Sequence, residues 1–159
     1  MTAEASSERR EPTPMTYVRV VAASFGTGLR SMAPLAALVR KPDVALPQLA
    51  TSEPVRILFA LASAGEIVAD KLPMTPSRLM RGPLSLRIML GALTGGIVAS
   101  SEDLPLPIGS LIGAVGAALG SWAGATLRQT LTERTPVPDQ LWAVIEDVVA
   151  VRLAVVAAA

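Results

Sequence analysis

The chain has 159 residues, enough for one domain, and a formal net charge of +1, which gives no reason to expect a nucleic-acid partner. It has neither cysteine nor histidine, so it lacks disulfides, thiolate chemistry and the commonest general base and transition-metal ligand. We therefore expect neither an enzyme nor a cofactor. Hydrophobic residues make up 51% of the chain but aromatic residues only 3%, which is typical of packed transmembrane helices rich in small side chains.

We expect residues 1–15 to form a disordered tail, because they are polar, contain proline and carry charges of both signs. Residues 16–159 then form a transmembrane helical domain. Each of five apolar segments approaches the roughly 20 residues that a helix needs to cross a bilayer, and proline clusters separate them. The segments span about 17–39, 54–72, 84–100, 106–127 and 140–158. The sequence predicts an all-α polytopic membrane bundle of about five helices, with the lipid bilayer as a partner.

Charge in the connections predicts an orientation. Lys71, Arg78 and Arg81 follow the second segment, whereas Glu102 and Asp103 follow the third. By the positive-inside rule the second connection is cytoplasmic and the third is outside. This predicts a multi-pass protein of the cell (inner or plasma) membrane with five crossings, a cytoplasmic N-terminus and an external C-terminus.

The later segments resemble the earlier ones. A shift of 90 positions aligns Gly26 with Gly116, and a shift of 81 aligns Glu66 with Asp147. One interpretation is an inverted repeat of two helices, one separate helix and two helices, an arrangement found in many transporters. The other is that helices rich in glycine and alanine match by chance.

The second segment carries the strongest candidate site. Glu66 and Asp70 are four residues apart and share a helix face. A central charge facing lipid costs roughly 2.5–3.5 kcal/mol on insertion scales, so this face should point into the bundle. In one interpretation the two acids attract a cation or carry a proton, and Arg30 counters or gates them. In the other, Asp70 and Lys71 lie at the membrane surface and Glu66 makes a structural ion pair with Arg30.

The first segment is expected to kink or break near Arg30. Pro34 removes the backbone hydrogen bond to the carbonyl of Arg30. The stretch 26–34 is either an ordinary kink with a paired arginine or an unwound segment lining a cavity. On the fifth segment Asp147 is a weaker candidate for the same transport or ion-pair role.

The fourth segment has a glycine stripe at spacings of three and four residues, typical of a glycine zipper. Its members are Gly109, Gly113, Gly116, Gly120 and Gly124. The stripe predicts close helix packing, within the chain or between the protomers of a homodimer; the alternative is a narrow pore lined by glycine.

Arg78, Arg81 and Arg87 form a predicted basic patch just inside the membrane. Its default role is to set topology, and it would also suit anionic lipid headgroups. No zinc, calcium or dinucleotide motif is present, and no metal can be assigned.

Two motifs carry a resemblance to a known family: Gly28-Leu29-Arg30 in the first segment and E-x-x-x-D-K-x-P, from Glu66 to Pro73, at the end of the second. With the glycine-rich later segments, they make residues 16–158 resemble the bacterial integral membrane proteins of domain-of-unknown-function group 4126. Residues 74–78 lack the aspartate that commonly follows the motif in that group. The resemblance implies the membrane architecture and highlights Arg30, Glu66, Asp70 and Lys71, without implying a substrate.

The leading functional prediction is a small transporter or channel-like protein for a cation, a proton or a small solute. The alternative is a structural or assembly membrane protein without transport activity.

Overall fold

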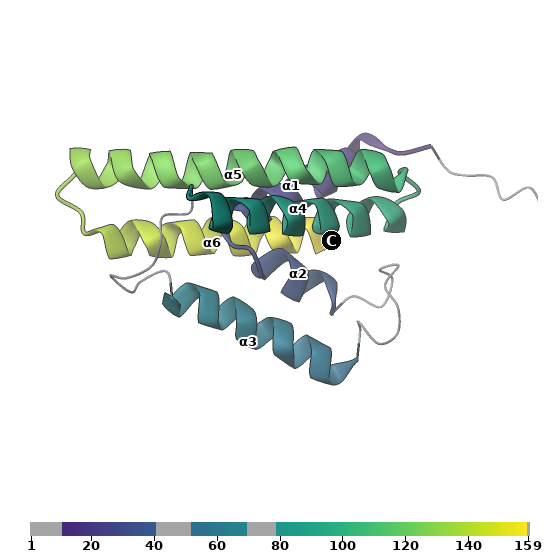
Figure 1. Cartoon of the computed structure of the whole chain (residues 1–159), viewed down its shortest axis with the longest axis horizontal. Helices are drawn as coiled ribbons and strands as arrows, with labels where there is room; N and C mark the ends of the chain where they lie inside the picture. Colours follow the sequence, from purple (N-terminus) through teal and green to yellow (C-terminus); the bar gives the residue numbers. More distant parts are fainter. Residues whose placement is uncertain (1–10, 41–51, 70–78, 159) are drawn as a thin grey trace, which may run out of the picture.

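The computed structural model describes residues 11–40, 52–69 and 79–158. These residues form six helices and no strands, so the prediction of an all-α fold is confirmed (Figure 1). The helices are α1 (Pro14–Leu29), α2 (Ala33–Leu38), α3 (Glu53–Ala69), α4 (Arg81–Ser101), α5 (Leu106–Arg134) and α6 (Asp139–Ala158). Most of the tail expected over residues 1–15 lies outside the described residues.

The start of α1 is fixed by its own sequence. The hydroxyl of Thr13 accepts the backbone N–H of Thr16, and the hydroxyl of Thr16 accepts the N–H of Thr13, which together form a capping box. Pro14 occupies the first turn, where a missing N–H costs nothing. Two of the unpaired donors at the start of α1 are therefore satisfied locally.

The first predicted segment is not one helix but a hairpin of two. α1 ends at Leu29, Arg30 is extended, and α2 turns back along the bundle (Figure 1). Leu38, at the end of α2, belongs to the same core cluster as Val20, near the start of α1, and as Ala157 on α6. The predicted break near Arg30 is confirmed, but the prediction that 17–39 makes a single crossing is wrong, because the chain enters the bundle and returns to the same end.

The other helices pack around this hairpin. α4 and α5 pack along much of their lengths, α1 lies between them and α6, and α2 packs on α6 (Figure 1). α3 lies outside this group, and its main described neighbour is α2. α3 is therefore a peripheral helix.

Glycines of α5 set the distance to two different helices. A Cβ atom built on Gly95 would lie 2.8 Å from the Cα of Gly113, and one built on Gly116 would lie 2.8 Å from the Cβ of Ser24. Gly109 and Gly113 thus meet α4, whereas Gly116 and Gly120 meet α1. Gly124, the last glycine of the predicted stripe, is buried. This stripe lies inside one chain.

The two ends of the bundle carry paired charges. Arg19 of α1 forms an ion pair with Glu102 at the turn between α4 and α5. At the opposite end, Arg128 of α5 pairs with Asp139 of α6, with N–O distances of 2.7 and 2.5 Å. The predicted orientation placed the start of the first segment and the turn at Glu102 on opposite sides, and the Arg19–Glu102 pair shows that this is wrong.

The hairpin also bears on the proposed repeat. The first segment consists of two short helices, whereas the fourth, which it was aligned with, is the single 29-residue helix α5. The two aligned segments therefore differ in structure, so this half of the repeat is not preserved. The alignment of Glu66 with Asp147 remains a sequence observation.

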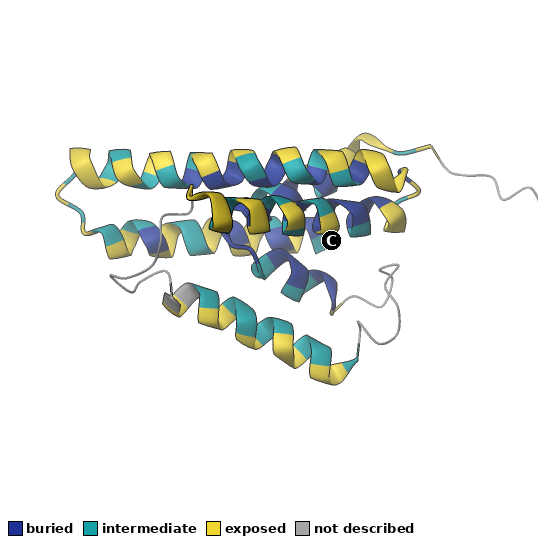
Figure 2. Cartoon of the chain, viewed as in Figure 1, coloured by how far each residue is buried: buried dark blue, intermediate teal, exposed yellow. Residues whose placement is uncertain are grey.

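Small apolar side chains make up much of the interior of the bundle, while many large ones lie on its surface. About half of the buried hydrophobic residues are alanines, while many large side chains of every long helix are exposed (Figure 2). Leu61 is 65% exposed, Met89 69% and Leu111 67%. Extended apolar surface of this kind marks contact with a membrane or another protein.

By length and composition, α4 and α5 could each cross a membrane. This supports the membrane prediction in part, for these two of the described helices.

Close packing at the glycines can be tested by alanine substitution. Gly95→Ala and Gly113→Ala should each destabilise the bundle by about 1–3 kcal/mol, because the added methyl group overlaps backbone atoms of the facing helix. The measurement is thermal or denaturant unfolding in detergent followed by circular dichroism. Gly65→Ala is the matched control: a Cβ there meets nothing within 4 Å, so only the gain in helix propensity of up to about 1 kcal/mol is expected. Equal effects at the three positions would contradict the packing account.

Candidate functional site

The break between α1 and α2 leaves backbone groups that need partners. The last carbonyls of α1 and the first N–H groups of α2 have no partner within their own helices. The residues concerned, Gly28, Leu29 and Arg30, are buried, and so is Ser31 beyond them. Buried backbone groups of this kind must be satisfied by other parts of the chain.

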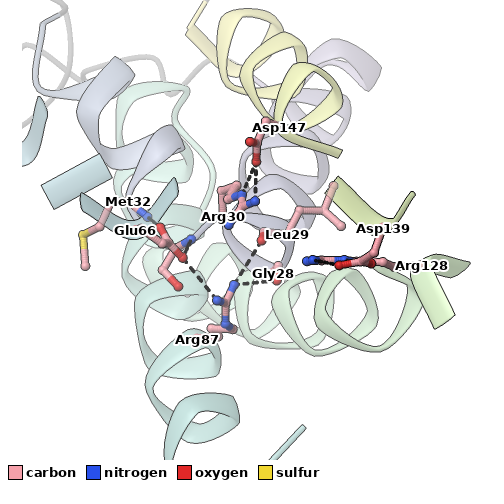
Figure 3. A network of polar contacts seen from close by, with 10 residues as sticks. Gly28, Leu29, Arg30, Met32, Glu66, Arg87, Arg128, Asp139 and Asp147 are labelled. Atoms are coloured by element: carbon pink, nitrogen blue, oxygen red, sulfur yellow. Dashed lines mark hydrogen bonds and ion pairs between the residues drawn. The ribbon is translucent and has the colours of Figure 1, made fainter. Parts of the chain in front are cut away.

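Glu66 satisfies the start of α2. Its Oε1 accepts the N–H of Ser31 at 2.8 Å, and its Oε2 accepts the N–H of Met32 at 2.9 Å (Figure 3). A carboxylate is favoured here, because N–H groups point at it and the helix N-terminus is electropositive. Glu66 therefore connects α3 to the α1–α2 hairpin through hydrogen bonds.

Arg87 of α4 satisfies the end of α1. Its Nη1 donates to the carbonyl of Gly28 at 3.0 Å and to that of Leu29 at 3.1 Å. Its Nη2 lies 3.2 Å from Oε1 of Glu66, so the two residues that hold the two sides of the break are also an ion pair (Figure 3). The hydroxyl of Ser121 on α5 also donates to the carbonyl of Gly28, at 3.1 Å.

The approach of α5 depends on the absence of side chains. A Cβ atom on Gly28 would lie 2.7 Å from the nitrogen of Ser121 and 2.8 Å from the Cα of Gly120. Only glycine at position 28 lets α1 and α5 come this close. The hydroxyl of Ser121 can then reach a carbonyl at the end of α1.

A second ion pair lies on the other side of the break. The guanidinium of Arg30, itself 1% exposed, forms an ion pair with the carboxylate of Asp147 on α6 (Figure 3). The side chain of Asp147 is 14% exposed. Arg30 in the break and three charged residues from α3, α4 and α6 thus converge on one discontinuity, and the charges of these two bases and two acids balance.

The predicted site residues are therefore grouped differently. Arg30, Glu66 and Asp147 come together at the break, but the partner of Glu66 is Arg87 and not Arg30. The reason is that Arg30 faces α6, whereas Arg87 reaches the break from α4. Asp70 and Lys71 lie outside the described residues.

The predicted headgroup patch is wrong for Arg87. This residue is 6% exposed and bound to carbonyls, so it cannot lie in a surface patch. Arg81 is exposed at the start of α4, and Arg78 lies outside the described residues. A signal was available in the sequence: Arg87 is six residues further into an apolar segment than Arg81, and a charge at that depth faces the bundle interior by default.

An apolar groove of about 360 Å³ lies between α5 and α6, beyond the end of α1. Because α1 ends at Leu29, only its last turns, with Phe25 and Leu29, reach this groove. The groove is bounded by Leu29 at the tip of the hairpin, by Leu127 and Leu131 of α5, and by Trp142 of α6. Leu29 also belongs to the polar network through its carbonyl, so the groove ends where the network begins.

Within the described residues, no three acidic side chains gather in a way that could hold a metal ion. The chemistry of the site is therefore that of two carboxylates, two guanidinium groups and the backbone groups of a broken helix.

Comparisons with protein-family models, with curated proteins and with solved structures found no significant match to this chain. The resemblance to domain-of-unknown-function group 4126 stays a prediction, and the roles of the residues rest on their geometry.

The Arg30–Asp147 pair should be essential for stability. Asp147→Ala should lower the free energy of unfolding by at least about 2 kcal/mol, because it leaves the guanidinium of a buried arginine without this carboxylate. Asp139→Ala is the control: its pair with Arg128 is partly exposed, and such pairs contribute about 0–1 kcal/mol. Unfolding in detergent measures both. A larger loss for Asp139→Ala than for Asp147→Ala would refute the assignment.

Proposed function

We propose that the chain is an integral membrane protein that moves a proton or a small ion or solute, with the α1–α2 break as its site. The observation that carries the proposal is the convergence of two ion pairs, Arg87–Glu66 and Arg30–Asp147, each between a buried arginine and a carboxylate that is 14% exposed, on a helix discontinuity inside a bundle with an apolar exterior. Discontinuous helices at mid-depth are where transporters build their binding sites.

The membrane location is supported by the distribution of side chains. Lipid tails are as apolar as leucine, so helices in a bilayer associate through small residues and polar contacts while large aliphatic side chains face outward. The bundle follows this pattern, with glycine and alanine at its contacts and leucine, valine and isoleucine on its surface. In the proposed arrangement α3, α4, α5 and α6 cross the membrane and the α1–α2 hairpin is re-entrant, with both of its ends on one side.

The site offers a way to couple charge to helix position. Glu66 links α3 to α2 and α4 through three contacts, all of which depend on its carboxylate. A proton or a cation that takes this carboxylate breaks the ion pair between Glu66 and Arg87 and weakens the attachment of α3. The groove between α5 and α6 gives a solute a route from one end of the bundle to Leu29.

The second candidate is a structural or assembly membrane protein. It is favoured by one observation: both oxygens of Glu66 already accept hydrogen bonds within the chain. In that case the polar contacts at the break only stabilise the hairpin, and the unsubstituted protein transports nothing.

A flux assay separates the two candidates. Membrane insertion is first checked by flotation of the purified protein with liposomes. Proton and cation flux are then followed with dyes enclosed in the liposomes. Glu66→Gln should reduce flux by at least about tenfold while the protein still inserts, because it removes the carboxylate that would take the proton or cation. A hydrogen bond to a charged group contributes about 1.5–3 kcal/mol, and about 1.4 kcal/mol corresponds to a factor of ten.

Glu133→Gln is the matched control, since Glu133 is an exposed residue near the end of α5 whose carboxylate accepts a hydrogen bond from the side chain of Gln129. Its flux should equal that of the parent. A folded, inserted parent with no flux above that of empty liposomes would favour the structural candidate. A parent that stays in the aqueous phase would end the membrane proposal.

Filling the groove gives an independent test. Ala123→Leu adds bulk to its wall on α5, away from the charged residues of the break. If solutes use this route, the variant should lose most of its flux while its unfolding midpoint changes little. Ala118→Leu, at a half-buried position on α5 that does not line the groove, is the control. Equal flux in the two variants would remove the groove from the pathway.

A further inference from the structure

We propose that the groove between the end of α2 and the start of α3 binds the phosphate headgroup of an anionic phospholipid. The inference rests on the proposed membrane location, but it concerns a different site from the break. The groove encloses about 450 Å³ and is lined by Arg40, Glu53, Arg56, Ile57, Ala60 and Leu61.

One guanidinium in this groove is held in place. The Nε of Arg56 donates to the carbonyl of Val39 at 3.1 Å, which fixes the side chain against the end of α2. Its Nη1 lies 3.8 Å from a carboxylate oxygen of Glu53, a residue whose side chain is 73% exposed. This is a weak, solvent-screened pair, so the positive charge of Arg56 remains largely available.

A second guanidinium lies nearby. Arg40 follows Val39 directly, is exposed, and lines the same groove. Two bases against one acid give the groove an excess positive charge. An arginine fork matches a phosphate group, because its planar donors reach two oxygens at once.

The remaining lining is apolar and leads away from the charges. Ile57 is 51% exposed and Leu61 is 65% exposed, and both lie on α3 beyond Arg56. They continue into the exposed apolar surface of α3, which also includes Leu58. A ligand that matches this surface has an anionic head and a hydrocarbon tail, which fits a phospholipid and not free phosphate.

The position along the bundle agrees with a headgroup site. The α1–α2 hairpin returns α2 to the end of the bundle that carries the Arg19–Glu102 pair. Arg40 and Arg56 therefore lie where the polar end meets the apolar exterior, the level at which headgroups lie in a bilayer.

The test compares lipid binding by variants. The full chain is reconstituted in vesicles of phosphatidylcholine or of an equal mixture of phosphatidylcholine and phosphatidylglycerol, and the bound phosphatidylglycerol is measured by native mass spectrometry after extraction. Arg40→Gln and Arg56→Gln should each weaken phosphatidylglycerol binding about fivefold, the contribution expected of one basic residue near an anionic lipid. Glu53→Gln should strengthen binding, because it removes the carboxylate that lines the groove among the described residues.

Two controls keep the inference falsifiable. Arg134→Gln removes an exposed arginine at the last residue of α5, at the opposite end of the bundle, and should leave binding unchanged, and Arg56→Lys should retain more binding than Arg56→Gln because it keeps the charge. Inorganic phosphate should not displace the lipid. An equal loss for Arg134→Gln, displacement by phosphate, or no change on Arg40→Gln in a folded protein would overturn the site. Failure of the parent to float with either vesicle would instead count against the membrane proposal itself.

Discussion

The structure depends on one constraint: the backbone at the α1–α2 break must find hydrogen-bond partners in the middle of an apolar bundle. Neither helix can supply them, because carbonyls of Gly28 and Leu29 and N–H groups of Ser31 and Met32 lie beyond the reach of its own ladder. The partners come from α3, α4 and α5, at hydrogen-bond distances of 2.8, 3.0 and 3.1 Å. The glycine contacts of α5 and the depth of a charge on α4 both follow from this need.

The same constraint explains why charges are tolerated here. A lone arginine or glutamate in this position would be costly, but each of the four charged residues has a partner of opposite charge, and two also replace missing backbone partners. The charges of these four described residues sum to zero. A balanced network can still respond to a single added charge, which is why it suits both a transport site and a rigid joint, and why flux is the measurement that separates them.

The sequence predicted the residues and the helix class of this arrangement better than the path of the chain and the pairing of the charges. The residues needed for a break were visible in Arg30 and Pro34, as were the helix class and the α5 glycine stripe. The reversal of the chain between α1 and α2 could not be predicted, because a proline predicts that a helix is interrupted but not in which direction it resumes. The partners in the two ion pairs could not be predicted either. Glu66 and Arg87 are 21 residues apart, and Arg30 and Asp147 are 117 residues apart. Helical periodicity carries no information at such separations. The predicted orientation was wrong because counting crossings assumed that every apolar segment traverses the bundle.

The separation of Arg30 from Asp147 bears on how the protein is made. A ribosome delivers the α1–α2 hairpin first, and the groups that complete it emerge only with α3, α4, α5 and finally α6. Until α6 is synthesised, the buried arginine lacks this carboxylate, so the network at the break is incomplete. The α1–α2 hairpin therefore reaches its final, paired state only after α6 has packed against it.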